Sequence, residues 1–148
     1  MAQEPQQPPF TLCVETSGTV CSVAVSKGEE VLAAVNNATP NVHASQLTIQ
    51  IANCLTEAGV KMQQLGLVAV SAGPGSYTGL RIGYGVAKGL CYTLNLPLVA
   101  VDTLQSLANG ILLSTNVKFE RYISLMDARR NHVYAAVYDA SLNEVVAP

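Results

Sequence analysis

The stretch Ala72-Gly73-Pro74-Gly75-Ser76-Tyr77-Thr78-Gly79-Leu80-Arg81 decides how this chain folds. It follows an unbroken apolar run at 67–71, which predicts a strand in a sheet that is covered on both faces. The glycine-rich turn leads into a predicted helix that continues to about Leu94 and ends at Asn95-Leu96-Pro97. A strand that passes through a tight turn into a helix is typical of a βαβ unit.

The segments on either side of this unit complete an α/β fold. Downstream, Leu98–Val101 predicts a second strand, and Asp102-Thr103 caps a further helix. Strands that alternate with helices pair in parallel through right-handed crossovers. Upstream, tight turns separate three short apolar runs and predict an antiparallel meander. The runs are Phe10–Val14, Val20–Val25 and Val31–Val35. We therefore expect a mixed β-sheet, an antiparallel meander plus βαβ, with helices packed on it.

A helix is also predicted between the meander and the βαβ unit. Thr39-Pro40-Asn41 opens it, because proline favours the first helical turn. One apolar stripe follows at spacings of three and four residues. It consists of Ala44, Leu47, Ile51, Cys54, Leu55 and Ala58. Gly59 ends the helix, because glycine adopts the left-handed backbone conformation of a helix C-terminus.

The pattern of the meander begins again near the C-terminal end. Tyr122–Met126 predicts a strand, Asp127 opens a polar turn, and Val133–Tyr138 and Glu144-Val145-Val146 predict two further strands. With Asp127 placed on Glu15, both copies show strand, acid, turn, strand, turn, strand. Few residues are identical, so this is a repeat of pattern. We expect a disordered lead-in at 1–9, an N-terminal domain at 10–101, and the beginning of a second related domain, truncated, at 102–148.

Composition and charge exclude several classes of protein. Apolar residues make up 49% of the 148 residues and charged residues 12%, which excludes disorder for most of the chain and indicates a surface that a partner covers. The net charge of −2 argues against autonomous nucleic-acid binding, and no apolar run has the length of a membrane span. The cysteines show no CxxC spacing and predict buried thiols in a reducing compartment. Since residues 1–9 do not resemble a signal peptide, we expect a cytoplasmic protein.

Four ordered sequence blocks resemble the TsaB (YeaZ) family. They are Cys13-Val14-Glu15-Thr16-Ser17, Gly73-Pro74-Gly75-Ser76-Tyr77-Thr78-Gly79-Leu80-Arg81-Ile82-Gly83, Val101-Asp102-Thr103-Leu104 and Met126-Asp127-Ala128-Arg129-Arg130. The resemblance extends from Phe10 to Val146, and members of the family are longer than this chain. It implies the actin-like ATPase (ribonuclease H-like) fold, in which two related domains flank a cleft.

The same resemblance implies a role in forming threonylcarbamoyladenosine in the anticodon loop of tRNA. The catalyst of that pathway is a sister protein with the same glycoprotease-like domain, TsaD. A TsaB-type chain is its non-catalytic heterodimer partner, helps to recruit the ATPase TsaE, and meets tRNA only within the complex. Without the sister protein, a homodimer is an alternative use of the same surface.

Candidate catalytic residues are few. By the resemblance, the histidine pair that binds metal in the sister protein corresponds here to Thr103 and Leu107, and neither replaces an imidazole. The two histidines of the chain, His43 and His132, lie in different predicted elements. We therefore expect no metal and no catalytic residue. The alternative is an enzyme, either an actin-fold phosphotransferase or a glycoprotease-like hydrolase. Ser76, Tyr77 and Thr78 could suggest a serine nucleophile, but capping of the helix by Ser76 or Thr78 explains them better.

Two interpretations of the glycine-rich turn stay open. Gly73, Gly75 and the amide of Ser76 precede a helix, which would suit an anion or a weakly bound ATP or ADP. Alternatively, the glycines only allow a tight turn and close packing. Glu15 and Asp127 begin the paired hairpins, where related ATPases hold Mg²⁺ through water. We expect weak nucleotide binding at most.

The predicted helix after the turn carries glycines on two faces. Gly79 and Gly83 lie on one side, and Gly85 and Gly89 on nearly the opposite side. Either all four relieve crowding within one domain, or one pair faces a partner. By the resemblance, this helix and the one at 41–58 form half of a four-helix bundle with the sister protein. The candidate interface residues are His43, Leu47, Ile51, Gly85, Val86 and Gly89. Arg129-Arg130 is more typical of a solvated loop than of a tRNA contact.

Overall fold

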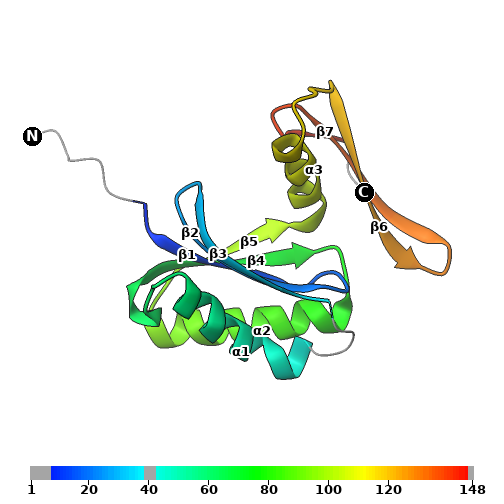
Figure 1. The fold of residues 1–148 in the computed structure, drawn as a ribbon. Helices are drawn as coiled ribbons and strands as arrows, with labels where there is room; N and C mark the ends of the chain where they lie inside the picture. The colour runs from blue at the N-terminus through cyan, green and yellow to red at the C-terminus, as the bar shows by residue number, and fades with distance from the viewer. Residues whose placement is uncertain (1–7, 39–42, 147–148) are drawn as a thin grey trace, which may run out of the picture.

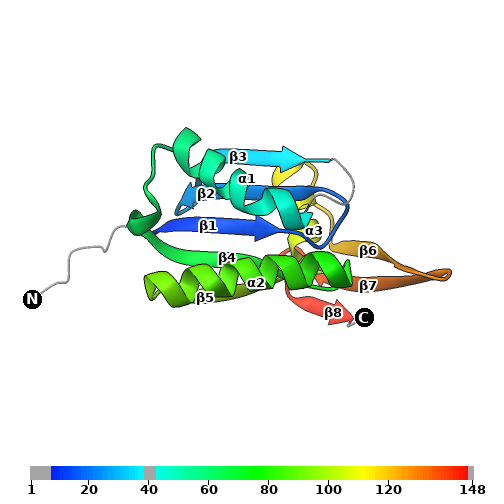
Figure 2. The same ribbon diagram turned by 90° about the horizontal axis from the view of Figure 1, so that it is seen from below.

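A five-stranded mixed sheet lies between two different layers (Figure 1). Two helices cover one face, and a third helix with a small second sheet stands at one end of the other face (Figure 1 and Figure 2). The computed structural model describes residues 8–38 and 43–146. Most of the predicted lead-in, 1–7, lies outside the described residues. Its last two residues are placed, and the ring of Pro9 lies against Gly66, so the expectation of disorder up to residue 9 is corrected there.

The strands of the large sheet follow the predicted order. They are β1 (Phe10–Glu15), β2 (Cys21–Lys27), β3 (Glu30–Asn37), β4 (Leu65–Gly73) and β5 (Leu98–Asp102). Across the sheet their order is β3-β2-β1-β4-β5. The first three strands pair antiparallel, whereas β4 pairs in parallel with both β1 and β5. The predicted mixed sheet, a meander joined to a βαβ unit, is therefore confirmed.

Helices α1 (His43–Glu57) and α2 (Tyr77–Leu94) lie side by side on one face of this sheet (Figure 2). The core forms beneath them because β1, β2 and β4 each point alternate side chains toward the helices. Its fully buried members include Leu12, Val23, Val25, Leu47, Cys54, Val68 and Val70. The predicted opening of α1 at 39–41 lies outside the described residues. Gly59 follows α1 with a φ of +66°, as predicted, and the short 3₁₀ helix η1 (Met62–Gln64) leads into β4.

The opposite face of the sheet is less covered than the apolar run of β4 predicted. Small side chains lie in register across it, from Ala34 through Ala24 and Cys13 to Ala69. Together with neighbouring residues they line a shallow hollow of about 240 Å³. Ala69 and Cys13 are only half-buried. The strand is central in its sheet, but only its helix-facing side is deeply buried, so the expectation of cover on both faces is wrong for this part of the sheet.

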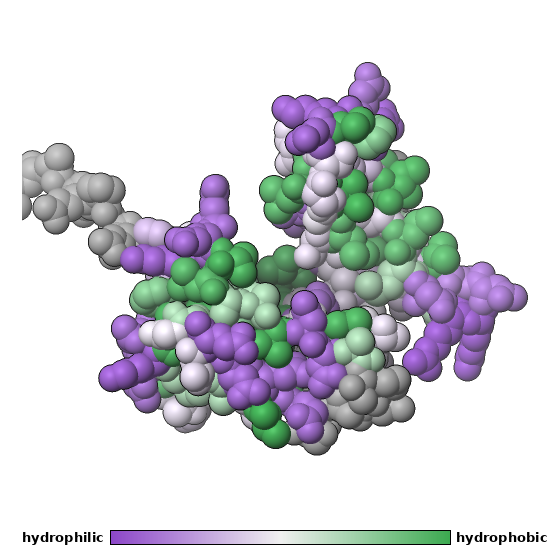
Figure 3. Space-filling model, in the orientation of Figure 1, coloured by the Kyte–Doolittle hydropathy of each residue, from purple (hydrophilic) through white to green (hydrophobic). Residues whose placement is uncertain are grey.

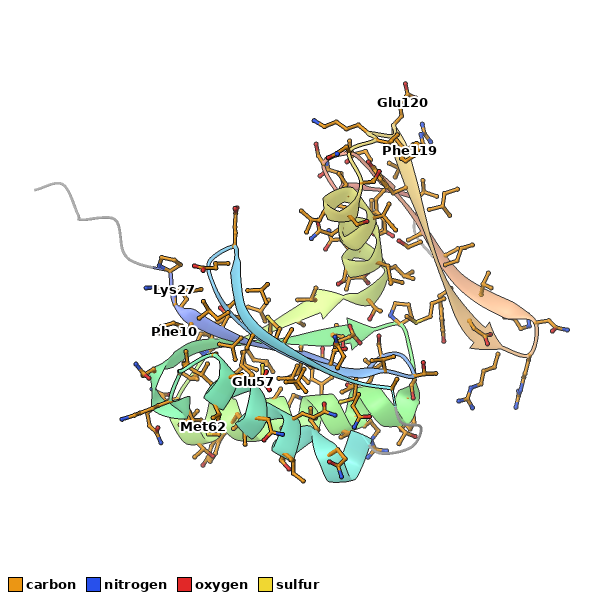
Figure 4. All side chains as sticks on the ribbon, in the orientation of Figure 1. Phe10, Lys27, Glu57, Met62, Phe119 and Glu120 are labelled. Atoms are coloured by element: carbon orange, nitrogen blue, oxygen red, sulfur yellow. The ribbon has the colours of Figure 1, made fainter. Side chains whose placement is uncertain are left out.

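The second sheet packs on its own helix. Helix α3 (Thr103–Ser114) leads into β6 (Arg121–Arg129), β7 (His132–Asp139) and β8 (Glu144–Val146), which pair antiparallel in that order. This arrangement repeats the pattern of the first meander. A separate apolar cluster holds it together, consisting of Leu104, Ala108, Tyr122, Ala136 and Tyr138. At the end of the hairpin farthest from the turn, the rings of Phe119 and Tyr122 pack edge to face (Figure 4).

Asp102 joins the two sheets. It ends β5, and its carboxylate accepts hydrogen bonds from the Gln105 amide at 2.8 Å and from the Tyr138 hydroxyl at 3.1 Å. The Ser124 hydroxyl adds a bond to the carbonyl oxygen of Leu104, at 2.7 Å. Burial, assisted by the hydrogen bond to Asp102, raises the pKa of Tyr138 to about 12. One carboxylate thus caps α3 and attaches the second sheet to it.

Candidate functional site

The glycine-rich turn between β4 and α2 packs against the turn between β1 and β2. The amide of Ser76 donates to the carbonyl oxygen of Ser17 at 2.7 Å, and a side chain on Gly75 would lie within 2.6 Å of the same oxygen. The Ser76 hydroxyl accepts a hydrogen bond from the Gly79 amide at 3.3 Å, so Ser76, and not Thr78, is the N-cap of α2. Both polar groups of Ser76 therefore have partners within the fold.

The face of α2 that points toward the sheet packs closely against Thr16. A methyl group on Gly79 would overlap the Thr16 carbonyl oxygen, and one on Gly83 would overlap the Thr16 hydroxyl. Thr16 is fully buried, and its amide donates to the Ser71 hydroxyl. These contacts explain Gly75, Gly79 and Gly83 by close packing. The structure therefore supports the packing interpretation of the turn, and nucleotide binding at Gly73, Gly75 and Ser76 stays a prediction.

Sequence reasoning missed Thr16 and Ser17 as the groups that the glycines accommodate. Their position in the motif Glu15-Thr16-Ser17 offered a signal, but a contact between segments so far apart in the sequence is not visible in a local pattern. The Glu15 carboxylate accepts a hydrogen bond from the Ser17 amide at 2.5 Å and so fixes the turn that receives α2. Glu15 thus has a structural task in this fold.

The outward face of α2 is open. A side chain on Gly85 or Gly89 would meet no atom within 4 Å, so these two glycines are not required by packing within the described residues. Tyr92 lies one turn further along the same face, with 93% of its side chain exposed. On the neighbouring helix α1, Ile49 is 50% exposed. We call Ile49, Gly85, Gly89 and Tyr92 the α1–α2 face.

Two of the predicted interface residues are corrected by the structure. Leu47 and Ile51 are 0% and 2% exposed and lie in the core between α1 and the sheet, so no partner reaches them in this fold. The apolar stripe of an amphipathic helix faces its own sheet, and Ile49, which sequence analysis missed, lies outside that stripe. Val86 is half-buried against the core. His43 is the first residue of α1, and its side chain lies outside the described residues.

The second acid, Asp127, belongs to the small sheet. Its carboxylate accepts a hydrogen bond from the amide two residues on, that of Arg129, at 2.7 Å. Glu15 makes the corresponding bond in the first copy. The predicted turn between Asp127 and His132 is shorter in the structure, because β6 continues to Arg129 and β7 begins at His132. Only Arg130 and Asn131 form the turn.

Groups that could bind a metal do not gather in the described part of the chain. There, no cluster of three or more His, Cys, Asp or Glu side chains is found. Thr103 and Leu107 lie one turn apart on α3, as the histidine pair of the resemblance would. Burial raises the pKa of all four cysteine thiols, and Cys54 donates to the carbonyl oxygens of Val23 and Ala33. Three of these thiols are buried and Cys13 is half-buried, and a raised pKa keeps them in the unreactive protonated form.

No helix in the described residues is long and apolar enough to cross a membrane.

Comparison with known proteins gives consistent results. The family model described as "TsaD: tRNA N6-adenosine threonylcarbamoyltransferase" matches residues 35–147. The "tRNA threonylcarbamoyladenosine biosynthesis protein TsaB" of Escherichia coli (strain K12) is 32% identical over 90% of this chain and 57% of its own length. The protein of the same name from Bacillus subtilis (strain 168) is 32% identical over 86% of this chain and 54% of its own length.

A solved structure supports the same assignment. "YeaZ from Pseudomonas aeruginosa" superposes with a TM-score of 0.84 at 32% identity, covering 95% of this chain and 65% of the other. The expected fold class is confirmed by this match. The chain spans little more than half the length of the two curated relatives named above. From the family match, the identities and the fold together, the chain belongs to the TsaB (YeaZ) family, which carries the TsaD-like, glycoprotease-type domain.

Proposed function

We propose that this chain is the non-catalytic partner of a TsaD-type enzyme in the formation of threonylcarbamoyladenosine in tRNA. It pairs with that enzyme through the α1–α2 face, and the pair recruits a TsaE-type ATPase. The chain acts in the cytoplasm and meets tRNA only within the complex. The observation that carries the proposal is the open, small-residue surface at Gly85 and Gly89 on a chain whose relatives are named for this pathway.

Physical reasoning supports an interface at this face. Glycine in the middle of a helix costs about 1 kcal/mol relative to alanine, so two glycines that no internal contact requires need another explanation. A helix surface without side chains lets a second helix approach closely. The exposed Tyr92 follows the glycines on the same side of α2, and the exposed Ile49 lies on the helix that packs beside α2. Both supply the apolar and aromatic area that interfaces favour.

The described residues also support a role without catalysis. Ser76, considered above as a nucleophile, uses its hydroxyl as a helix cap that accepts a hydrogen bond from the Gly79 amide. Leu107, at a position that binds metal in the sister protein by resemblance, cannot act as a ligand. A phosphotransferase or a glycoprotease-like hydrolase would need groups that this arrangement does not bring together.

Light scattering coupled to size-exclusion chromatography tests the pairing. The chain is run alone and mixed with the TsaD-type protein of the same organism, and we expect a one-to-one complex. If the chain forms a homodimer alone, the sister protein should displace it. A folded chain that forms no complex with the sister protein would contradict the proposal.

A matched set of variants locates the interface. Gly85→Leu and Gly89→Leu place side chains where a partner helix would approach, so both should weaken association at least tenfold, which corresponds to about 1.4 kcal/mol. Leucine favours a helix more than glycine does, so the melting temperature should not fall. Gly110→Leu on α3 is the control, because Gly110 also faces open space but on the other side of the sheet. Unchanged association of the α2 variants would exclude this face.

A further inference from the structure

The turn of the β6–β7 hairpin is an exposed basic tip. Figure 1 shows the hairpin extending away from the large sheet, and Figure 3 shows hydrophilic residues gathered at its end. Arg129, Arg130, Asn131 and His132 are all exposed there. Beside them is an open hollow of about 550 Å³ that also includes Asp127 and Leu125 in its lining.

The backbone of this tip is unusual for its residue types. Arg129, Arg130 and Asn131 have φ angles of 66°, 53° and 61°, all in the left-handed region. A two-residue hairpin turn of this kind favours Asn, Asp or Gly, because these residues tolerate a positive φ. Asn131 suits its position, whereas the two arginines do not. Residues that oppose local backbone preference are retained where their side chains have a task.

The arginine side chains have no task within the fold. Neither Arg129 nor Arg130 makes a side-chain hydrogen bond or ion pair with any described residue, although the main-chain amide of Arg129 donates to the Asp127 carboxylate. Three other cations of the described residues, Lys27, Arg81 and Lys88, each pack on an aromatic ring. The Lys27 ammonium lies 5.4 Å from the centre of the Phe10 ring (Figure 4). Arg81 packs on the Tyr77 ring, and its guanidinium group donates a hydrogen bond to the Tyr77 hydroxyl. The tip therefore carries two guanidinium groups without a side-chain partner among the described residues, on a turn with positive φ angles.

We propose that this tip binds phosphate groups of tRNA when the chain is in its complex. The inference rests on the proposed function, which places an RNA in the reaction. A guanidinium group presents a planar fork of donors that matches a phosphate, and two adjacent arginines can hold two phosphates or grip one from two sides. Because the chain carries a net charge of −2, phosphate attraction is confined to local positive sites such as this tip. RNA is favoured over an acidic protein surface because the relatives are named for tRNA modification.

The test measures tRNA binding by the assembled complex. Fluorescence anisotropy with labelled tRNA is recorded over a range of salt concentrations for the complex of this chain with the TsaD-type protein. The double variant R129Q/R130Q should weaken binding roughly tenfold. It should also reduce the slope of log K against log salt by about 1 for each lost contact. Its association with the sister protein should be unchanged.

Two further variants separate phosphate binding from a structural role. Arg130→Asn places a favoured residue in the turn, so it should raise the melting temperature of the chain while weakening tRNA binding. If the arginines had only a structural role, Arg130→Asn would raise the melting temperature without weakening tRNA binding. The charge-matched control is K118Q/R121Q, which removes two exposed positive charges at the opposite end of the hairpin and should leave tRNA binding unchanged.

The outcomes distinguish this inference from the function on which it rests. A wild-type complex that binds tRNA, with the affinity and salt slope unchanged in R129Q/R130Q, would overturn the phosphate site and leave the proposed function intact. Loss of association with the sister protein in that variant would make the tip a protein contact and also overturn the inference. If the wild-type chain forms no complex, the proposed function fails and the inference fails with it.

Discussion

The two β-meanders of this protein share a plan and differ in how they are buried. Each begins with a strand that ends near an acid, and in each the carboxylate accepts a hydrogen bond from the amide two residues on, Ser17 for Glu15 and Arg129 for Asp127. The first meander is covered by α1 and α2 and receives glycines of α2 against its turn. The second packs only one face, on α3, and leaves Ile123, Leu125 and Val133 exposed on the other.

This difference shows that the strand pattern and the burial of a meander have separate causes. The alternation of side chains that builds the sheet is local, and it is the same in both copies. Stability depends on what packs against the sheet, because apolar side chains contribute only when they leave water. The first meander is therefore expected to be the more stable of the two, and the second leaves apolar side chains in contact with water. Four predictions test this contrast.

The largest difference in stability is expected between truncating a buried leucine of the first meander and truncating an exposed leucine of the second. Leu12 is fully buried in β1, so Leu12→Ala should cost about 3 kcal/mol of unfolding free energy. Leu125 of β6 is 59% exposed, and Leu125→Ala should change that free energy by less than about 0.5 kcal/mol. Urea unfolding at low protein concentration measures both. Similar costs for the two variants would mean that the outer face of the hairpin is buried in solution.

The second prediction compares glycines on the two faces of α2. Gly79→Ala would force a methyl group into the Thr16 carbonyl oxygen, so we expect a loss of about 2 kcal/mol. Gly85→Ala meets open space and should stabilise the chain by up to about 1 kcal/mol through helix propensity. In thermal unfolding of the chain alone, the melting temperature should fall for Gly79→Ala and rise for Gly85→Ala. A gain in stability for Gly79→Ala would contradict the packing of α2 on the first meander.

The third prediction concerns the attachment of the second meander. Tyr138→Phe removes the hydrogen bond to Asp102 and should cost about 1 kcal/mol near neutral pH. The pKa of Tyr138 rises from 10.0 to about 12 on folding, so the neutral hydroxyl is favoured in the folded state. Its contribution is complete below pH 10 and is lost as the pH rises toward 12. The stability difference between wild type and variant should therefore narrow over that range, and a difference that stays constant would exclude the linkage.

The smallest effects are expected at the two corresponding acids. Glu15 is half-buried and its turn receives α2, so Glu15→Ala should cost about 1 kcal/mol. Asp127 is exposed, and Asp127→Ala should cost no more than about 0.5 kcal/mol. Hydrogen exchange of the Ser17 and Arg129 amides, compared with wild type, reports each bond directly. Equal costs at both acids would show that the contrast in burial does not extend to the turns.

Sequence patterns predicted most of the fold and less of the site. The mixed sheet, both meanders, the cap at Ser76 and the end of α1 at Gly59 follow from periodicity and turn residues, which act over a few positions. The resemblance to the family assigned Leu47 and Ile51 to a partner surface, although the apolar stripe to which they belong faces the sheet of its own domain. An apolar side chain at a given position has the same spacing whether it meets its own sheet or another protein.

The sequence by itself determined the family, the order of the elements and the glycines that allow α2 to approach closely. Only the tertiary structure decided which glycines of α2 contact the rest of the domain. Gly79 and Gly83 pack against Thr16, whereas a side chain on Gly85 or Gly89 would have no atom of the described residues within 4 Å. It also decided that Arg129 and Arg130 have positive φ angles at a hairpin turn and no side-chain partner in the part of the chain that the structure describes. The physical reason is that helix and strand formation depend on neighbours along the chain, whereas burial and charge pairing depend on segments that folding brings together from distant positions.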